Sequence, residues 1–569
     1  MATEPFDVII VGSGAAGGTA AYVLTSLGAR VCLLEAGRYY EPGRETPMFQ
    51  RHGAAPLADA GTPDKPFGFY DATVDGGWVL PEEPYTTAPG TEFRWFRARM
   101  LGGRTNHWGR VALRYANHDF KAYSLDGLGA DWPFTYEEFA PWYDRAERMV
   151  GVFGTNEHLP DIPDSPPGCL QPPPVPRSYE RLVIAGGRRL GRPVVASHEA
   201  VITQPLNGRL ACFYASPCLR GCAIRANFQS PTVMLAPASA SGRLTTITHA
   251  QVYEVDLAPD GLVRGVHYVD RLTREHHYLA GRAVMLGASA MESVRILFNS
   301  RSARFPDGIG SASGLLGRGV LSTPGSNVWG RFPQMEGLPP FNDDGVVSLP
   351  HIFIPWWLLP EQRAGRLPFA RGYHIELYGG RTEPSAYTFD QFNVVSPLTY
   401  GKRLKEEARR YYGSFVRFSQ RGEMVMRDSN RVVIDPQMKD AWGIPGLCFD
   451  VRWSGQELRQ TAHAQRSMVE FIEAAGGQVV SPPPSDPRQA ITAPGRMIHE
   501  VGGARAGADP RKSVTDSYGR VWGVPNLYVI DGAVFPSSAN KNPTLTIIAF
   551  AWRASEHLRK YLRKELPHA

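Results

Sequence analysis

Residues 6–37 read FDVIIVGSGAAGGTAAYVLTSLGARVCLLEAG and combine a glycine motif with two apolar runs and a helical pattern. The apolar run at Asp7–Val11 predicts a strand, and the periodicity of Ala16–Leu27 predicts the helix that follows it. A second apolar run at Arg30–Leu34 ends at Glu35. This strand–helix–strand order predicts a unit of an α/β fold that binds a dinucleotide.

Gly12, Gly14 and Gly17 have the G-x-G-x-x-G spacing between the first strand and the helix. The first glycine permits a tight turn, the second lets backbone approach a pyrophosphate, and the third lets helix and strand pack closely. The N–H groups at the start of the helix favour phosphate binding. Glu35 follows Gly17 by 18 residues and is placed to accept a hydrogen bond from a ribose hydroxyl. The motif by itself leaves NAD and FAD open.

Length and composition indicate a large globular chain. At 569 residues, with 43% hydrophobic and 11% aromatic residues, two or three domains or one two-lobed enzyme are expected. The net charge of +6 is spread along the chain, which argues against nucleic-acid binding. The longest apolar run, Ile352–Leu359, is far short of the ~20 residues of a transmembrane helix. The chain enters its first strand almost at once, so we expect no export signal of its own and a cytoplasmic location; export with a signal-bearing partner remains an alternative.

Four separated patches resemble the glucose–methanol–choline (GMC) family of FAD oxidoreductases. They are the glycine motif, LGGRTNHWGR at 101–110, LGASAMESVRIL at 286–297, and the segment 498–546 with IHEVGG and ANKNPTLT. Within that family, the chain looks closest to the sugar dehydrogenases and pyranose oxidases. The stretches that carry this closer resemblance lie at 130–147, 212–230 and 430–445.

The resemblance implies an α/β architecture in which a Rossmann-like FAD-binding domain is interleaved with a substrate domain built on an antiparallel β-sheet with helices. The expected FAD-binding domain consists of 1–38, 94–125, 205–330 and 490–569, and the expected substrate domain of 126–204 and 331–489. Residues 39–93 are expected to form an excursion, either a lid or an oligomer contact.

The resemblance also makes FAD the expected cofactor. It implies that the glycine motif and Glu35 hold the pyrophosphate and the adenosine ribose, and that Val252 and Ala288 lie at the adenine end. Asp531 is expected near the ribityl chain, and residues 542–544 at the pyrimidine end of the flavin. The cofactor-binding residues that we assign are Gly12, Gly14, Gly17, Glu35, Gly103, Thr105, Asn106, His107, Trp108, Val252, Ala288, Asp531, Gly532, Pro543 and Thr544.

His499 and Asn542 are the expected catalytic residues. Oxidation of an alcohol needs a base for the hydroxyl proton while a hydride leaves the carbon, and a neutral histidine suits this task. An amide holds the same hydroxyl without competing for its proton. The family places such a pair some 40 residues apart, and here the separation is 43.

His107 has two interpretations. Some pyranose oxidases bind their flavin covalently through a histidine at this place, whereas other relatives hold FAD without a covalent bond. We favour a non-covalent FAD, with His107 packed near the dimethylbenzene edge of the flavin.

Cys212, Cys218 and Cys222 form a C-x5-C-x3-C pattern. Closely spaced thiols are soft ligands suited to iron–sulfur chemistry. Some sugar dehydrogenases of this branch carry a three-iron cluster on such a pattern. Ala223 stands where those relatives often have proline, so buried thiols kept for packing remain the alternative.

The expected activity is oxidation of a secondary hydroxyl of a pyranose sugar or glycoside to a ketone. Oxygen, a quinone or a partner redox protein would accept the electrons, so oxidase and dehydrogenase both stay open. A lyase of the same fold with structural FAD is a further alternative. A homo-oligomer is compatible with the sequence, and for the aromatic stretch Phe353–Leu359 (FIPWWLL) we favour a subunit contact over a sugar-binding surface.

Overall fold

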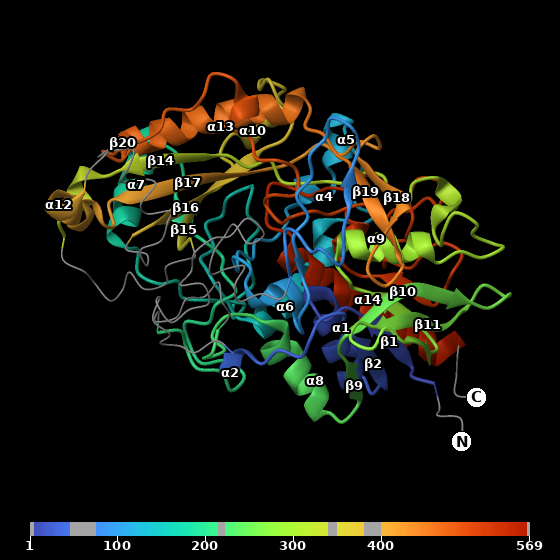
Figure 1. Cartoon of the computed structure of the whole chain (residues 1–569). Helices are drawn as coiled ribbons and strands as arrows, with labels where there is room; N and C mark the ends of the chain where they lie inside the picture. The colour runs from blue at the N-terminus through green and yellow to red at the C-terminus, as the bar shows by residue number, and fades with distance from the viewer. Residues whose placement is uncertain (1–4, 46–75, 214–221, 339–349, 381–399, 566–569) are drawn as a thin grey trace.

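Two β-sheets organise the protein (Figure 1). The computed structural model describes residues 5–45, 76–213, 222–338, 350–380 and 400–565. One sheet is five-stranded and parallel, and the other is six-stranded and antiparallel. The expected α/β fold with a Rossmann-like sheet and an antiparallel sheet is therefore confirmed.

The parallel sheet contains the predicted dinucleotide-binding unit. Its spatial order is β21 (Leu527–Val529), β13 (Val284–Leu286), β1 (Val8–Val11), β2 (Val31–Leu34) and β9 (Leu244–Ile247). Helix α1 (Ala15–Ser26) follows β1, and helix α14 (Thr544–Glu565) follows β21 and lies against α1. Strands β1, β2, β13 and β21 are buried along their whole length, as expected for a parallel sheet covered on both faces.

The antiparallel sheet has one face against helices and the other toward the parallel sheet. Its order is β20 (Gln478–Val479), β14 (Asn327–Arg331), β17 (Phe415–Gly422), β16 (Tyr373–Gly379), β15 (Ile352–Ile354) and β8 (Val195–Ala196). Helix α13 (Gly455–Ala474) runs along this sheet and contacts α7 (Ser178–Leu190) (Figure 1). Tyr373, Ile375 and Leu377 of β16 belong to the core beneath these helices. Because side chains alternate along a strand, the residues between them face the opposite side.

Smaller elements join the two sheets. A three-stranded antiparallel sheet follows the order β10 (Ala250–Leu257), β11 (Val263–Asp270) and β12 (His276–Ala280), and α9 (Ala290–Asn299) contacts β10. Helix α6 (Tyr136–Val150) begins with a capping box in which Thr135 accepts from the N–H of Glu138. A second small sheet follows the order β18 (Arg431–Lys439), β19 (Pro445–Asp450) and β4 (Thr86–Thr87). The remaining short elements are α2 (Pro42–Glu45), β3 (Gly76–Gly77), β5 (Arg97–Ala98), α4 (Asn117–Phe120), α5 (Ala122–Asp126), β6 (Val152–Phe153), β7 (Leu170–Gln171), α8 (Ala236–Ala240), α10 (Leu359–Arg363) and α12 (Gly401–Tyr411).

Most of the aromatic stretch at 353–359 lies in the interior. Ile354, Trp356 and Leu359 are buried in the core shared with α7 and α13, and Phe353 is buried beside Val111 on the other face of the sheet. The preference for a subunit contact is therefore wrong for these four residues. The reason is that both faces of β15 are packed, one against the core shared with α7 and α13 and the other against the cluster around Val111.

The end of the predicted excursion returns to the body of the protein. β3 pairs with β5, β4 pairs with β19, and the buried Glu83 forms an ion pair with Arg99 at 2.5 Å. Residues 46–75, where a lid or oligomer contact was expected, lie outside the described residues. Within the described ranges, none of the helices is long and apolar enough to cross a membrane.

Candidate active site

A large cavity lies where the carboxyl ends of the parallel strands face the antiparallel sheet. It encloses about 1710 Å³, part of which is open solvent. Gly12, Glu35, Ala288 and Asp531 each follow a strand of the parallel sheet and line the cavity. Ligands of open α/β sheets bind at this edge. The lining extends from the glycine motif to strands β16 and β17, so the cavity can hold a dinucleotide with a substrate beside it.

The glycine motif shapes one end of this cavity. Gly12 has a φ of +90°, and a Cβ at Gly17 would lie 1.7 Å from the Gly12 carbonyl oxygen, so α1 packs directly onto the turn. At Gly14, an added Cβ would meet no described atom within 4 Å. Gly14 thus exposes backbone to open space at the start of α1, where a pyrophosphate would pass. These three environments fit the predicted role of each glycine.

Glu35 is buried and held by the same turn. It accepts hydrogen bonds from the Ser13 N–H (3.1 Å), the Ser13 hydroxyl (2.5 Å) and the Gly37 N–H (2.8 Å). The Ser13 hydroxyl also accepts from the Gly102 N–H at 2.8 Å, which joins the glycine motif to the 101–110 patch. A carboxylate fixed at this edge of the cavity fits a ribose hydroxyl.

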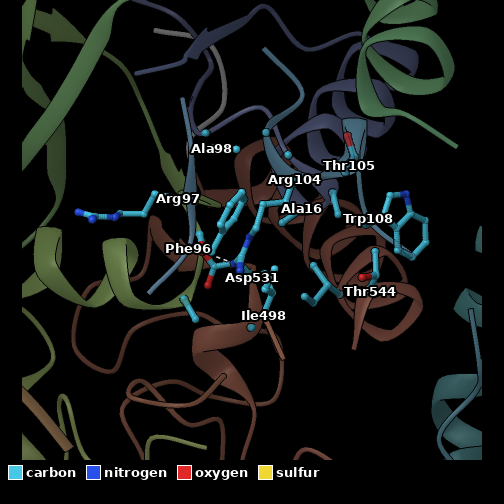
Figure 2. Close-up of a pocket in the computed structure, with 18 of the residues that line it drawn as sticks. Ala16, Phe96, Arg97, Ala98, Arg104, Thr105, Trp108, Ile498, Asp531 and Thr544 are labelled. Carbon is cyan, nitrogen blue, oxygen red and sulfur yellow. Dashed lines mark hydrogen bonds between the residues drawn. The ribbon is translucent and has the colours of Figure 1, made fainter. Parts of the chain in front are cut away.

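Arg104 spans the middle of the cavity, and its side chain points toward Asp531 (Figure 2). Its guanidinium donates to Glu500 and to the Ser289 hydroxyl, each at 2.6 Å. Burial raises the pKa of Asp531 to about 6, against the opposing effect of the Ser293 hydroxyl, which donates to it at 2.5 Å. Thr105, Trp108 and Thr544 line the same cavity and lie to the right of Arg104 in Figure 2.

Most of the predicted cofactor residues come together around this cavity. Those that line it are Gly12, Gly14, Glu35, Gly103, Thr105, His107, Trp108, Val252, Ala288, Asp531, Gly532, Pro543 and Thr544. Gly17 and Asn106 are not among its lining residues. Gly17 packs the helix, whereas the Asn106 amide donates to the Leu101 carbonyl at 2.9 Å and holds the turn before His107.

His107 is buried at the cavity wall. Burial, followed by the nearby Arg110 and Arg104, lowers the pKa of His107 to about 3, so its ring is neutral. The ring meets Phe96 edge-to-face at 5.5 Å. This position fits either a histidine packed beside a flavin or a site of covalent attachment.

His499 lines the cavity and follows a strained residue. Ile498 has a φ of +58°, a conformation that a β-branched side chain rarely adopts. Such strain is held in place by the surrounding structure and often marks functional sites. Burial, followed by the Arg421 charge, lowers the pKa of His499 to about 3, so the ring is neutral at physiological pH. The Thr323 hydroxyl lies 3.3 Å from Nδ1 of His499.

Asn542 lines the same cavity. Its amide Nδ2 donates to the buried Glu376 carboxylate at 3.1 Å. Its Oδ1 is buried and has no hydrogen-bond partner among the described residues. A buried amide oxygen left unpaired is costly, so a donor on a bound molecule would satisfy it.

A buried ion cluster holds the segment before Asn542. The ammonium of Lys541 lies 2.9 Å from Asp119 and 3.0 Å from Asp161, with His118 beside both carboxylates. Burial alone would lower the pKa of Lys541, but the two aspartates outweigh it and raise that pKa. Lys541 is therefore a buried cation, and it anchors the residue next to Asn542 to α4 and to the chain around Asp161.

Glu376, Tyr378 and Arg421 also line the cavity, and they were not predicted from the sequence. They lie on β16 and β17, on the face opposite the helix-covered core. The available signal was the polar residues His374, Glu376 and Tyr378 at alternate positions of an otherwise apolar strand. No motif connects them to His499 or Asn542.

The cysteine pattern is described in part. Cys222 is buried in a small apolar cluster with Ile202 and Ala226, and Cys212 packs against it. Cys218 lies outside the described residues. Over the described residues, no group of three or more His, Cys, Asp or Glu side chains is arranged to hold a metal ion. The iron–sulfur cluster remains a prediction.

Two family models match segments of the chain that contribute to this cavity. The family model for GMC oxidoreductase matches residues 427–551, which include His499 and Asn542, and the model for an FAD binding domain matches residues 7–41. Paromamine 6'-oxidase of Streptomyces fradiae is 28% identical over 97% of this chain and 91% of that protein. The fructose dehydrogenase large subunit of Gluconobacter japonicus is 27% identical over 98% of both chains.

A third relative and a solved structure extend the comparison. The 2-methyl-1,2-propanediol dehydrogenase of Mycolicibacterium austroafricanum is 28% identical over 97% of this chain and 95% of that protein. The crystal structure of pyridoxine 4-oxidase from Mesorbium loti superposes with a TM-score of 0.62, covering 98% of this chain and 99% of that one at 16% identity. That likeness shows a shared fold.

Proposed function

The chain belongs to the GMC oxidoreductases, FAD-dependent enzymes that act on CH–OH groups, and on this premise we propose that it oxidises a secondary hydroxyl of a pyranose sugar or glycoside to a ketone. The observation that carries the proposal is one cavity lined by the glycine motif, a neutral His499 and the unsatisfied amide oxygen of Asn542.

The residues of this chain divide the work between the two ends of the cavity. The turn at Gly12–Gly14 and Glu35 would hold the pyrophosphate and ribose, and Asp531 and Thr544 would lie along the rest of the cofactor. FAD, when bound, supplies the acceptor for the hydride of the substrate carbon. His499 takes the hydroxyl proton on a neutral ring nitrogen, and Asn542 holds the same hydroxyl in place.

Similarity to proteins named for sugars supports the substrate class. Besides fructose dehydrogenase, the relatives include a pyranose 2-oxidase of Emericella nidulans, 32% identical over 25% of this chain. A sugar and glycoside panel that also contains simple 1,2-diols, scored by anaerobic bleaching of the flavin, tests cofactor, reaction and substrate class together. A same-fold lyase would leave the flavin oxidised with every member of the panel.

His499→Ala is the direct test of the catalytic base. Since general-base catalysis contributes roughly 10²–10⁴-fold, flavin reduction by substrate should slow by about that factor while FAD stays bound. His463→Gln is the matched control: burial also lowers the pKa of His463, to about 4, but its ring contacts Tyr373 on the helix-covered face of the sheet. Unchanged reduction kinetics in His499→Ala would overturn the assignment.

Three further measurements test the electron acceptor, the attachment of the flavin and the presence of a cluster. Peroxide release in air, compared with quinone or dye reduction, separates an oxidase from a dehydrogenase with a redox partner. A yellow pellet after acid precipitation would indicate a covalent flavin at His107, where we propose a non-covalent one. Iron analysis of the purified protein tests whether Cys212, Cys218 and Cys222 hold a cluster.

A further inference from the structure

We propose that Glu376 is a positioning residue that fixes the orientation of the Asn542 amide, so that Oδ1 and the second N–H of Asn542 face the substrate. This inference rests on the proposed role of Asn542 in holding the hydroxyl. It concerns a carboxylate that lies 166 residues earlier in the chain, on the central antiparallel strand β16.

The contacts of Glu376 favour an ionised carboxylate. Arg421 forms an ion pair with Oε2 at 2.5 Å, and the Tyr378 hydroxyl donates to the same oxygen at 2.5 Å. His374 lies 3.4 Å from Oε1. Burial would raise the pKa of Glu376, but Arg421 and then His374 outweigh it and hold that pKa well below its usual range.

An ionised carboxylate determines which way the neighbouring amide points. It has no proton to donate, so it can only accept hydrogen bonds. The Asn542 Nδ2 must therefore face Glu376 Oε1, as observed at 3.1 Å. A flipped amide would place its Oδ1 against a buried anion and lose a charge-assisted hydrogen bond.

This orientation leaves one N–H and the carbonyl oxygen of the amide for other partners. The buried Oδ1 has none among the described residues, although Asn542 lines the cavity. The remaining N–H can donate to the hydroxyl oxygen whose proton goes to His499, so the amide binds that oxygen without competing for the proton. The negative charge of Glu376 also offsets Arg421, the charge that disfavours protonation of His499.

Glu376 lies on a strand that is held from both sides. Its strand is paired on both sides, with Glu376 opposite Ser419 of β17 and Phe353 of β15. His374 on the same strand contacts the Asn540 carbonyl, so β16 touches the 540–542 segment at two places. A side chain held by a central strand positions its partner more closely than one on a loop would.

Glu376→Gln tests the inference because it keeps the shape and removes the charge that selects the amide orientation. The limiting rate of anaerobic flavin reduction should fall by on the order of 10²-fold, the loss expected when a reacting group is misplaced. The decisive measurement is a double-mutant cycle with Asn542→Ala. If Glu376 acts through Asn542, the same substitution in the Asn542→Ala background should slow reduction by less than about threefold.

Glu457→Gln is the matched control. Glu457 is another buried glutamate of the same region, with Arg427 3.3 Å away, and it caps α13 instead of contacting the cavity. Glu457→Gln should lower the free energy of unfolding of the protein without changing the rate of flavin reduction. If Glu376→Gln fails to fold because Arg421 is left unpaired, Glu376→Gln with Arg421→Met removes both charges and enters the cycle instead.

The outcomes separate this inference from the proposed function. Equal slowing by Glu376→Gln with and without Asn542 would overturn the positioning role, as would an unchanged rate in Glu376→Gln when Asn542→Ala is slow. An unchanged rate in Asn542→Ala itself would overturn the proposed function of that residue, and the inference with it.

Discussion

The two ends of the cavity are built in different ways. At the nucleotide end, Gly12, Gly14, Gly17 and Glu35 lie within 24 consecutive residues. The shape of this end depends mainly on the backbone of the three glycines. At the catalytic end, Glu376, Arg421, His499 and Asn542 come from four distant segments. Buried charges hold that end together, at Glu376 with Arg421 and at Lys541 with its two aspartates.

The difference teaches where each end is vulnerable. A turn that depends on the absence of side chains is distorted when a Cβ is added, because the atoms nearest to the new Cβ belong to the backbone and cannot move away. The catalytic end, which is held by buried ion pairs, is destabilised when one partner of a pair is removed, because the other partner is left with an uncompensated charge. Removing one such support should therefore damage mainly its own end of the cavity.

The largest effect is expected from Lys541→Met. It leaves Asp119 and Asp161 buried without their cation, so the free energy of unfolding should fall by about 3–5 kcal/mol. The loss should shrink as the pH falls and the carboxylates become protonated. Denaturant unfolding of the FAD-loaded protein measures it, with retained FAD showing that the nucleotide end is intact.

Two companion variants sharpen that result. Arg264→Gln removes the cation of an exposed ion pair with Asp256 and should leave the unfolding midpoint unchanged. Adding Asp119→Asn and Asp161→Asn to Lys541→Met removes the uncompensated charges and should restore part of the stability. A Lys541→Met protein as stable as the parent would contradict the buried cluster.

Gly17→Ala is expected to have the next largest effect, at the opposite end. The new Cβ would lie 1.7 Å from the Gly12 carbonyl oxygen, so α1 must move away from the turn. We expect a loss of about 1–3 kcal/mol in the stability of the apoprotein, together with weaker FAD binding. Thermal unfolding of the apoprotein and FAD titration measure the two quantities.

Gly14→Ala is the matched control within the same motif. Its Cβ would meet only open space, and its φ of −68° suits alanine, so the apoprotein should unfold as the parent does. FAD binding should still weaken, because the methyl group occupies the path of the pyrophosphate. Equal destabilisation of the two apoproteins would refute the separate roles of the glycines.

The smallest effect is expected from pH, and it concerns the catalytic end. Since burial lowers the pKa of His499 to about 3, the base stays neutral from pH 8 down to about 5, and flavin reduction should not lose rate near pH 6.5. Only as the pH falls toward 3 should protonation remove the base. Stopped-flow reduction across this range provides the measurement.

Asp531 is the group to separate from His499 in that experiment, because burial raises the pKa of Asp531 to about 6. An acid limb near pH 6 that disappears in Asp531→Asn belongs to the cofactor side of the cavity. An acid limb near 6.5 that persists in Asp531→Asn would show that His499 is less buried in the working enzyme than in this structure.

Much of the nucleotide end could be predicted from local sequence. The glycine spacing, the apolar runs around it and Glu35 predicted β1, α1, β2 and a carboxylate at the strand end, because each feature depends on residues close in the chain. The capping box of Thr135 and Glu138 at the start of α6 likewise depends only on residues close in the chain. The resemblance of the 498–546 segment to the family pointed to His499 and Asn542 as candidates.

Only the tertiary structure decided what surrounds those two candidates. Glu376 meets Asn542 because β16 turns its polar side chains toward the cavity, while Ile375 and Leu377 pack under α13. The alternation of polar and apolar residues separates the two faces of β16, but only sheet pairing and helix packing bring the polar face to Asn542. The burial of Trp356 had the same cause and overturned the expected contact surface. Local sequence determined the backbone that receives the cofactor, whereas long-range packing determined the charges that position the catalytic side chains.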